Sequence, residues 1–167
     1  SRGLGDVYKR QHQKEPWVDT VLILLYSGWR ISELLNLKPE DISLQAGTMK
    51  GGTKTKAGKD RVVPIHSKIR PLVEARLAEG GPRLISYNGR VCNQTQYRIF
   101  WADIMKALEM KHTPHECRHT FETQLDSAGA NRKCIDLLMG HVSKDTGNRV
   151  YNHKTLDELK ATVELIK

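Results

Sequence analysis

Apolar residues recur along most of the chain at intervals of three and four, the spacing of a helix that buries one face. Local signals mark the ends of several of these segments. Gly28 and Gly140 each follow a periodic run, and Thr113 followed by Pro114 is a favourable helix start. The pattern predicts helices over residues 15–28, 30–37, 66–81, 92–109, 113–129, 131–140 and 155–166.

Three stretches depart from the helical spacing. Residues 47–65 hold two strand-forming runs separated by a segment rich in glycine and lysine, which predicts an antiparallel hairpin. Residues 82–90 predict a short strand and turn, and residues 143–155 a turn or a short helix. The expected fold is therefore mainly α with a small antiparallel β-sheet (α+β).

The length of 167 residues suits one domain with a core of ordinary size. We expect residues 1–13 to be a disordered or non-native leader and residues 14–167 to form the domain. The longest apolar run, residues 21–26, is far too short to span a bilayer, and residues 1–16 contain no apolar signal segment. The expected location is the cytoplasm, with no membrane partner.

Charge and cysteine content narrow the class of function. The net charge is +8, from 27 Lys and Arg against 19 acidic residues. A basic domain of this size favours a polyanionic partner such as nucleic acid. Charge alone does not distinguish such a protein from a generically basic one. Cys92, Cys117 and Cys134 are odd in number and lack the C-x-x-C spacing. We therefore expect reduced, partly buried thiols and neither a disulfide framework nor a cysteine-rich zinc module.

The segment HECRH, residues 115–119, admits two kinds of site. It matches the H-E-x-x-H pattern, in which two histidines of one helix bind zinc and the glutamate acts as a base. The longer zinc-binding extension does not follow, and Arg118 would place a cation beside the metal. We therefore expect no metal between His115 and His119.

A phosphate site is the second interpretation. His115 and Arg118 are three residues apart and share a helix face, and their place in the first helical turn adds a partial positive charge. A phosphodiester needs more than one arginine to hold its two non-bridging oxygens. A second arginine is therefore expected elsewhere in the chain.

Four segments, in order, resemble the conserved boxes of the tyrosine recombinases, the phage and transposon integrases. YSGWRISELLNLKPEDISL resembles the first arginine box, with Arg30 as its arginine, and HECRHTF resembles the H-x-x-R box. LLMGH followed by NRVYNHKT resembles the closing histidine and nucleophilic tyrosine, and a lysine hairpin lies between the first two boxes. The likeness runs from about Trp17 to the C-terminus. The sequence between these boxes and after the tyrosine resembles integrases of phages and conjugative elements of Gram-positive bacteria more than it resembles chromosome-dimer resolvases.

The resemblance implies roles for the arginine boxes. Arg30 and Arg118 would clamp the scissile phosphate, and Glu33 would orient Arg30 or the lysine. His115 would be a general acid/base or a donor to the phosphate, and His119, one turn on, would support the site or pack against it.

The closing boxes would supply a donor and the nucleophile. The resemblance makes His141 a donor to a non-bridging oxygen and Tyr151 the group that attacks the phosphodiester. No other tyrosine follows a histidine box at that spacing. A free phenol has a pKa near 10, so attack requires help from neighbouring cations and a proton acceptor.

The lysine that would protonate the leaving 5′-hydroxyl has two candidates. Counting forward from the first arginine favours Lys54, and counting back from the end of the second strand favours Lys56. Residues two apart in a strand share a face, so the pattern leaves both open, with Lys54 preferred. Lys50, Lys56 and Lys59 are expected to contact DNA phosphates.

The resemblance implies a site-specific DNA recombinase or integrase catalytic domain. It would cleave and rejoin strands through a 3′-phosphotyrosyl intermediate, without metal, ATP or other cofactor, to integrate or excise a mobile element. The alternatives are a type IB topoisomerase-like strand transferase and, in a different class, a zinc-dependent peptidase. The family's N-terminal core-binding and arm-binding domains have no counterpart among residues 14–167.

Partners are implied in the same way. They are double-stranded DNA with attachment-type sites, further copies forming a tetramer on DNA, and accessory DNA-bending or excision factors, in a bacterial cell or phage-infected host. The last helix has an apolar stripe that must be buried: Leu156, Leu159, Val163 and Ile166. We expect this stripe to dock on a neighbouring protomer, with packing on its own domain as the alternative.

Overall fold

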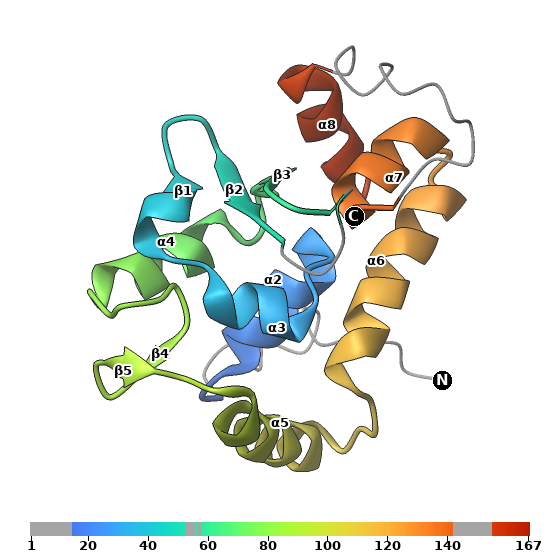
Figure 1. The fold of residues 1–167 in the computed structure, drawn as a ribbon. Helices are drawn as coiled ribbons and strands as arrows, with labels where there is room; N and C mark the ends of the chain where they lie inside the picture. Colours follow the sequence, from blue (N-terminus) through green and yellow to red (C-terminus); the bar gives the residue numbers. More distant parts are fainter. Residues whose placement is uncertain (1–14, 53–55, 57, 142–154) are drawn as a thin grey trace.

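The computed structural model describes residues 15–52, 56, 58–141 and 155–167. Helices make up most of this part, with small antiparallel sheets beside them (Figure 1), which confirms the expected fold class. The helices are α2 (Val18–Ser27), α3 (Ile31–Asn36), α4 (Arg70–Ala78), α5 (Gln94–Leu108), α6 (Pro114–Ser127), α7 (Arg132–Met139) and α8 (Leu156–Val163), with a 3₁₀ turn η2 (Pro39–Asp41). The strands are β1 (Ile42–Ser43), β2 (Thr48–Gly51), β3 (Arg61–Pro64), β4 (Ser86–Tyr87) and β5 (Arg90–Val91).

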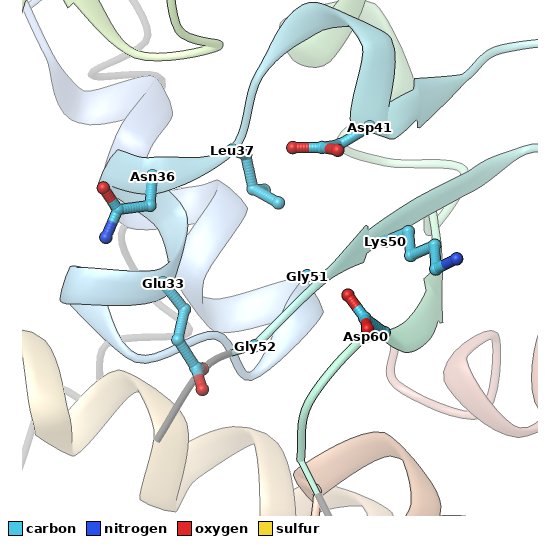
Figure 2. Close-up of a pocket in the computed structure, with 8 residues that line it drawn as sticks. All are labelled: Glu33, Asn36, Leu37, Asp41, Lys50, Gly51, Gly52 and Asp60. Atoms are coloured by element: carbon cyan, nitrogen blue, oxygen red, sulfur yellow. The ribbon is translucent and has the colours of Figure 1, made fainter. Parts of the chain in front are cut away.

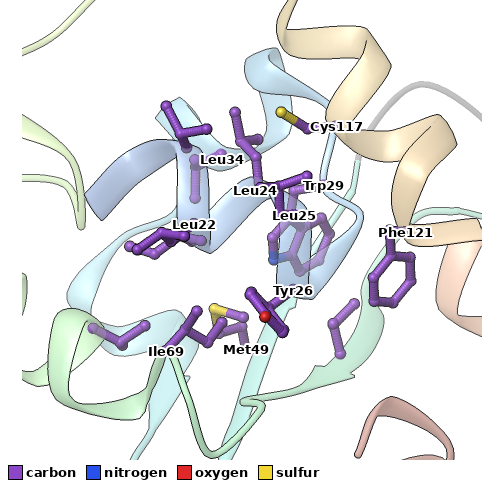
Figure 3. Close-up of a cluster of buried hydrophobic side chains, with 14 of the residues drawn as sticks. Leu22, Leu24, Leu25, Tyr26, Trp29, Leu34, Met49, Ile69, Cys117 and Phe121 are labelled. Carbon is purple, nitrogen blue, oxygen red and sulfur yellow. The ribbon is translucent and has the colours of Figure 1, made fainter. Parts of the chain in front are cut away.

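Helix α2 forms the centre of the core because most of its residues are apolar. All of its residues except Asp19 are buried. In the cluster of buried side chains drawn in Figure 3, Leu22 and Leu24 of α2 lie together with Met49 of β2 and Phe121 of α6. The helices and the sheet therefore pack around α2, and each fully buried large apolar side chain contributes about 1.5–3 kcal/mol.

The turn at Gly28 fixes where the first arginine box lies. Gly28 has a φ of 70°, and its N–H donates to the Leu24 carbonyl over 3.0 Å, ending α2. A Cβ atom at this position would lie 2.4 Å from Cδ1 of Phe121. Only glycine permits both this left-handed backbone and the close approach of α6. The chain leaves α2 directly into Trp29 and Arg30.

The predicted hairpin over residues 47–65 is present as β2 and β3. The two strands pair antiparallel, with Met49 opposite Val63 and Gly51 opposite Arg61. A short third strand, β1, pairs with β2 and was not predicted. Two residues are too few to produce an alternating pattern, so the sequence carries no signal for it.

The stretch at residues 82–90 forms a hairpin, where the sequence predicted one strand and a turn. Strands β4 and β5 pair across a two-residue turn made by Asn88, with a φ of 51°, and Gly89, with a φ of 70°. These residue types favour the positive φ angles that such a turn requires.

Helix α6 begins where the sequence predicted. Thr113 has an extended backbone, Pro114 is the first helical residue, and the Glu116 carboxylate accepts a hydrogen bond from the Thr113 N–H. This reciprocal cap satisfies a backbone donor that would otherwise lack a partner. The cap places His115 in the first turn of the helix.

The helix predicted over residues 66–81 begins later, at Arg70. Tertiary contacts hold the preceding residues outside it. The His66 ring lies 2.9 Å from the Ile166 carbonyl, and the Ser67 N–H donates to the Glu164 carboxylate over 2.7 Å. Contacts with the C-terminal residues therefore override the local helical tendency.

Helix α8 packs on its own domain. Leu159, Val163 and Ile166 are buried, and the helix contacts α7 and β3 (Figure 1). The expectation that this stripe docks on a neighbouring protomer is therefore wrong for this structure, and the alternative holds. The cause is the set of contacts that draw residues 164–166 against His66 and Ser67.

Two further expectations concern the chain as a whole. Cys92, Cys117 and Cys134 are free thiols, and each is buried more completely than the partial burial expected from the sequence. Within the described residues, no helix is long and apolar enough to cross a membrane. The predicted leader, residues 1–13, lies outside that part of the chain.

Candidate active site

Arg30 stands immediately before α3. Its backbone N–H donates to one oxygen of the Glu33 carboxylate over 3.0 Å, and its Nη1 donates to the other over 3.1 Å. The Arg30 side chain is 20% exposed, whereas that of Glu33 is 1% exposed. The Glu33 carboxylate therefore binds the Arg30 guanidinium on its buried side, and part of the guanidinium stays accessible to solvent.

Arg61 is the second partner of Glu33, and it is not among the residues predicted from the sequence. Its Nη2 and Nη1 donate to the two oxygens of Glu33 over 2.6 and 3.0 Å, and its Nε donates to the Leu138 carbonyl over 3.0 Å. The guanidinium lies 4.3 Å from the centre of the Trp29 ring. The signal was available, because Arg61 is two residues before the inward-facing Val63 and shares its side of the strand.

The two arginines determine the charge of Glu33. Burial alone would raise the pKa of this carboxyl, but the hydrogen bonds and positive charges of Arg61 and Arg30 lower it to about 2. Glu33 is therefore a carboxylate throughout the physiological pH range.

Arg118 is almost fully buried at the junction of two helix ends. Its Nη1 donates to the Gly28 carbonyl over 2.7 Å, and its Nη2 donates to the Met139 carbonyl. Burial, followed by the nearby charges of Arg30 and Arg61, lowers its pKa to about 10. The two arginines that the sequence singled out are therefore brought into one region.

His141 enters the same region from the end of α7. Its N–H donates to the Asp136 carbonyl over 2.9 Å, directly after the left-handed Gly140. Burial, and then the positive charges of Arg118 and Arg30, lower the pKa of the half-buried imidazole. Three segments distant in the sequence thus converge around Arg30, Arg118 and His141.

The two histidines of α6 lie next to each other. The rings of His115 and His119 are 4.7 Å apart and nearly perpendicular, and both residues are exposed. Arg118 differs from them because it is buried, although the sequence predicted a face shared with His115. Across the residues that the structure describes, no group of three or more His, Cys, Asp or Glu side chains is arranged to hold a metal ion.

The remaining candidates are described only in part. Lys54 and Tyr151 fall outside the described residues. Lys50, Lys56 and Lys59 are exposed on β2 and on the segment between β2 and β3.

A pocket opens beside Glu33, between α3 and the β2–β3 hairpin. Its lining includes Lys50, Gly52 and Asp60 from the hairpin. Figure 2 shows the Glu33 side chain extending from α3 toward Gly52. The hairpin that carries the candidate lysines therefore lies against the helix that follows Arg30.

Comparison with known proteins agrees with this arrangement. The chain matches the phage integrase family over residues 7–158. It is 36% identical over 148 residues to the tyrosine recombinase XerC of Pelobacter propionicus, covering 83% of this chain and 48% of that protein. It is 36% identical over 154 residues to the tyrosine recombinase XerA of Pyrococcus furiosus, covering 86% and 52%. The chain thus spans about half the length of these relatives.

Solved structures give the same result. The crystal structure of XerA recombinase superposes with a TM-score of 0.70 at 26% identity, covering 95% of this chain and 60% of that one. The Tn1549 transposon integrase in complex with circular intermediate DNA gives 0.65 at 25% identity, covering 86% and 55%. The similar proteins include Xer recombinases and a transposon integrase, so the closer likeness to integrases of mobile elements stays a prediction. They favour neither the topoisomerase nor the zinc peptidase. The chain belongs to the phage integrase family, and its fold is that of a tyrosine recombinase catalytic domain.

Proposed function

We propose that this chain is the catalytic part of a site-specific recombinase that cuts and rejoins DNA strands in the cytoplasm. The observation that carries the proposal is the charge around Arg118. Within the described part of the chain, Arg118 donates to backbone carbonyls and forms no ion pair with a carboxylate, while Arg30 and Arg61 lie close enough to lower its pKa. A bound phosphodiester would supply the compensating negative charge.

The proposed chemistry is an exchange of phosphate esters. The Tyr151 hydroxyl gives its proton to His115 as its oxygen attacks phosphorus, and a 3′-phosphotyrosyl bond forms while the bond to the 5′-oxygen breaks. The departing oxygen takes a proton from Lys54, or from Lys56 as the alternative. A 5′-hydroxyl from a partner strand then reverses the step and frees the tyrosine. Because one ester replaces another, the exchange needs no ATP. Arg30 and Arg118 supply the positive charge for which other phosphoryl transfers use a metal.

The remaining groups act on the charge of the phosphate. Arg30 and Arg118 hold its two non-bridging oxygens, with Glu33 orienting Arg30. His141 donates to the same oxygens, and its burial and the positive charges of Arg118 and Arg30 lower its pKa in the DNA-free protein. His115 acts as base for the tyrosine hydroxyl and as acid when the step is reversed, and His119 supports it.

The proposed partners follow from the chemistry. Duplex DNA with attachment-type sites is the substrate, and exchange between two duplexes requires four active sites, hence a tetramer on DNA. Lys50, Lys56 and Lys59 are proposed to contact backbone phosphates. The reaction would serve the integration or excision of a mobile element, together with accessory DNA-bending or excision factors.

Trapping of a covalent protein–DNA adduct tests the proposal. The 167-residue chain, and any longer natural polypeptide that contains it, is incubated with labelled nicked duplexes whose central sequence is randomised. A nick beside the scissile phosphate lets the leaving fragment diffuse away, so the adduct accumulates. We expect a protease-sensitive band on a denaturing gel, and sequencing of the trapped DNA would identify the site. Failure of both polypeptides to form this band contradicts the proposal.

A further inference from the structure

Arg61 bonds to three separate parts of the site. It donates to Glu33 of α3, to the Gly58 carbonyl of the hairpin over 3.3 Å, and to the Leu138 carbonyl in the last turn of α7. Glu33 in turn holds Arg30, and Leu138 lies three residues before His141. All three guanidinium nitrogens of Arg61 are engaged, each by a group from this region.

Close backbone packing surrounds the Arg61 side chain. A Cβ atom on Gly52 would lie 1.9 Å from the Gly58 carbonyl oxygen and 2.7 Å from Nη1 of Arg61. A Cβ atom on Gly140 would lie 2.7 Å from the Cα of Gly58 and 3.2 Å from Cδ of Arg61. Two glycines therefore allow the hairpin and the end of α7 to approach the same guanidinium.

We propose that Arg61 is a positioning residue for strand transfer, whose guanidinium fixes Arg30, the lysine-bearing hairpin and His141 relative to one another. The inference rests on the proposed function. A planar fork is needed, because one side chain must donate to a carboxylate and to two carbonyls in fixed directions. A lysine in its place would keep the charge and lose this geometry.

The charges around Glu33 explain why loss of Arg61 would also displace Arg30. Arg30, Arg61 and Arg118 all act on this carboxylate, and Asp41, Lys50 and Asp60 line the pocket beside it. Without Arg61, the buried Glu33 retains Arg30 as its hydrogen-bonding cation. The pair would then shift together, and Arg30 would leave the position from which it holds the phosphate.

Arg76 supplies a matched control elsewhere in the fold. It is also buried, donates to both oxygens of Asp19 over 2.5 and 2.8 Å, and lies 4.5 Å from the centre of the Trp17 ring. Replacing either arginine by methionine therefore removes an ion pair of a buried guanidinium and a ring contact, although Asp19 is more exposed than Glu33. Only Arg61 contacts the proposed active site.

The experiment compares Arg61→Met, Arg76→Met and the double variant Glu33→Gln/Arg61→Met, using the nicked duplex that the parent captures. We expect Arg61→Met to slow single-turnover adduct formation about 100-fold at saturating DNA, as small misplacements of reacting groups do. DNA affinity should change by less than about threefold, because Arg61 is too buried to meet backbone phosphates. Arg76→Met should lower the melting temperature and leave the rate within about twofold of the parent.

The double variant separates positioning from folding. It removes the buried carboxylate that has lost Arg61 and keeps only Arg30 as a partner, so we expect it to regain most of the thermal stability that Arg61→Met loses. It should still form adduct about 100-fold more slowly than the parent. It also keeps the test valid if Arg61→Met fails to fold. A double variant that recovers the rate together with the stability overturns the inference.

The outcomes also separate the inference from the function on which it rests. If the parent forms adduct and Arg61→Met is as fast as Arg76→Met, Arg61 has no positioning role and the proposed function stands. If the parent forms no adduct, the proposed function falls, and the inference falls with it.

Discussion

Glu33 shows how one buried carboxylate can serve both folding and the site. Its two oxygens accept hydrogen bonds from Arg30 and Arg61, and its side chain is 1% exposed. A pKa near 2 in place of 4.5 means that the folded protein stabilises the charged form by about 3 kcal/mol.

The loss of folding stability at low pH should therefore depend on Glu33. Because the folded-state pKa lies below the unfolded value, this contribution is present above about pH 4.5 and is lost as the pH falls toward about 2. Relative to Glu33→Gln, the parent should lose about 3 kcal/mol of unfolding free energy over that window, measured by urea denaturation. Parallel pH profiles for the two proteins would contradict this assignment.

Replacing the nucleophile and replacing an arginine that binds the phosphate should have different effects on DNA binding and on adduct formation. Tyr151→Phe removes one oxygen and leaves the cationic groups in place, so it should bind DNA within about twofold of the parent and form no adduct. Arg30→Ala keeps the nucleophile and leaves Glu33 paired with Arg61, but it loses several kcal/mol of transition-state stabilisation, so trace adduct should appear at long times. Denaturing gels of time courses distinguish them. An adduct from Tyr151→Phe would mean that another residue attacks.

At this scale the sequence singled out Arg30 and Arg118, whereas the alternation of its strand was the only signal for Arg61. The first two lie in segments with a recognisable pattern of neighbours. Arg61 lies in a strand, where the alternation places it on the inner face, but a charged residue is ordinarily expected to face water. Its burial depends on Glu33, which lies 28 positions earlier in the chain.

Among the elements, the end of α2 provides the sharpest test of packing. Gly28→Ala adds a methyl group 2.4 Å from Phe121 at a backbone φ of 70°, which combines overpacking with left-handed strain. We expect a loss of about 2–5 kcal/mol in unfolding free energy. Gly129→Ala, at a φ of 75° with no atom within 4 Å, isolates the strain and should cost about 1–2 kcal/mol. If the two variants lose the same unfolding free energy in urea titrations, the contact with Phe121 adds nothing to the cost of the left-handed backbone.

Element boundaries were predictable where a local signal set them. Thr113 and Pro114 begin α6, and Gly28 and Gly140 end α2 and α7, as the pattern indicated. The late start of α4 and the docking of α8 were not predictable. Both depend on contacts between His66 and the C-terminal residues, about 100 positions away in the chain.

For the whole molecule, the net charge of +8 bears on how it meets DNA. Each phosphate neutralised by a lysine or arginine releases counterions, so affinity should fall linearly with salt on a logarithmic scale. Lys59→Ala should lower the magnitude of that slope by about 1, with little dependence on DNA sequence. Fluorescence anisotropy at a series of salt concentrations measures the slope. Affinity that does not change with salt would contradict an electrostatic interface.

The hydrogen bonds from Arg118 to the ends of α2 and α7 have an evolutionary consequence. Its guanidinium joins two helices, so a descendant that no longer cut DNA would still need it to fold. Tyr151 has no such duty in the proposed scheme, and drift would remove it freely once selection for cutting ceased. Among relatives of this chain, retention of the arginine would therefore report an intact fold, whereas retention of the tyrosine would report a working enzyme.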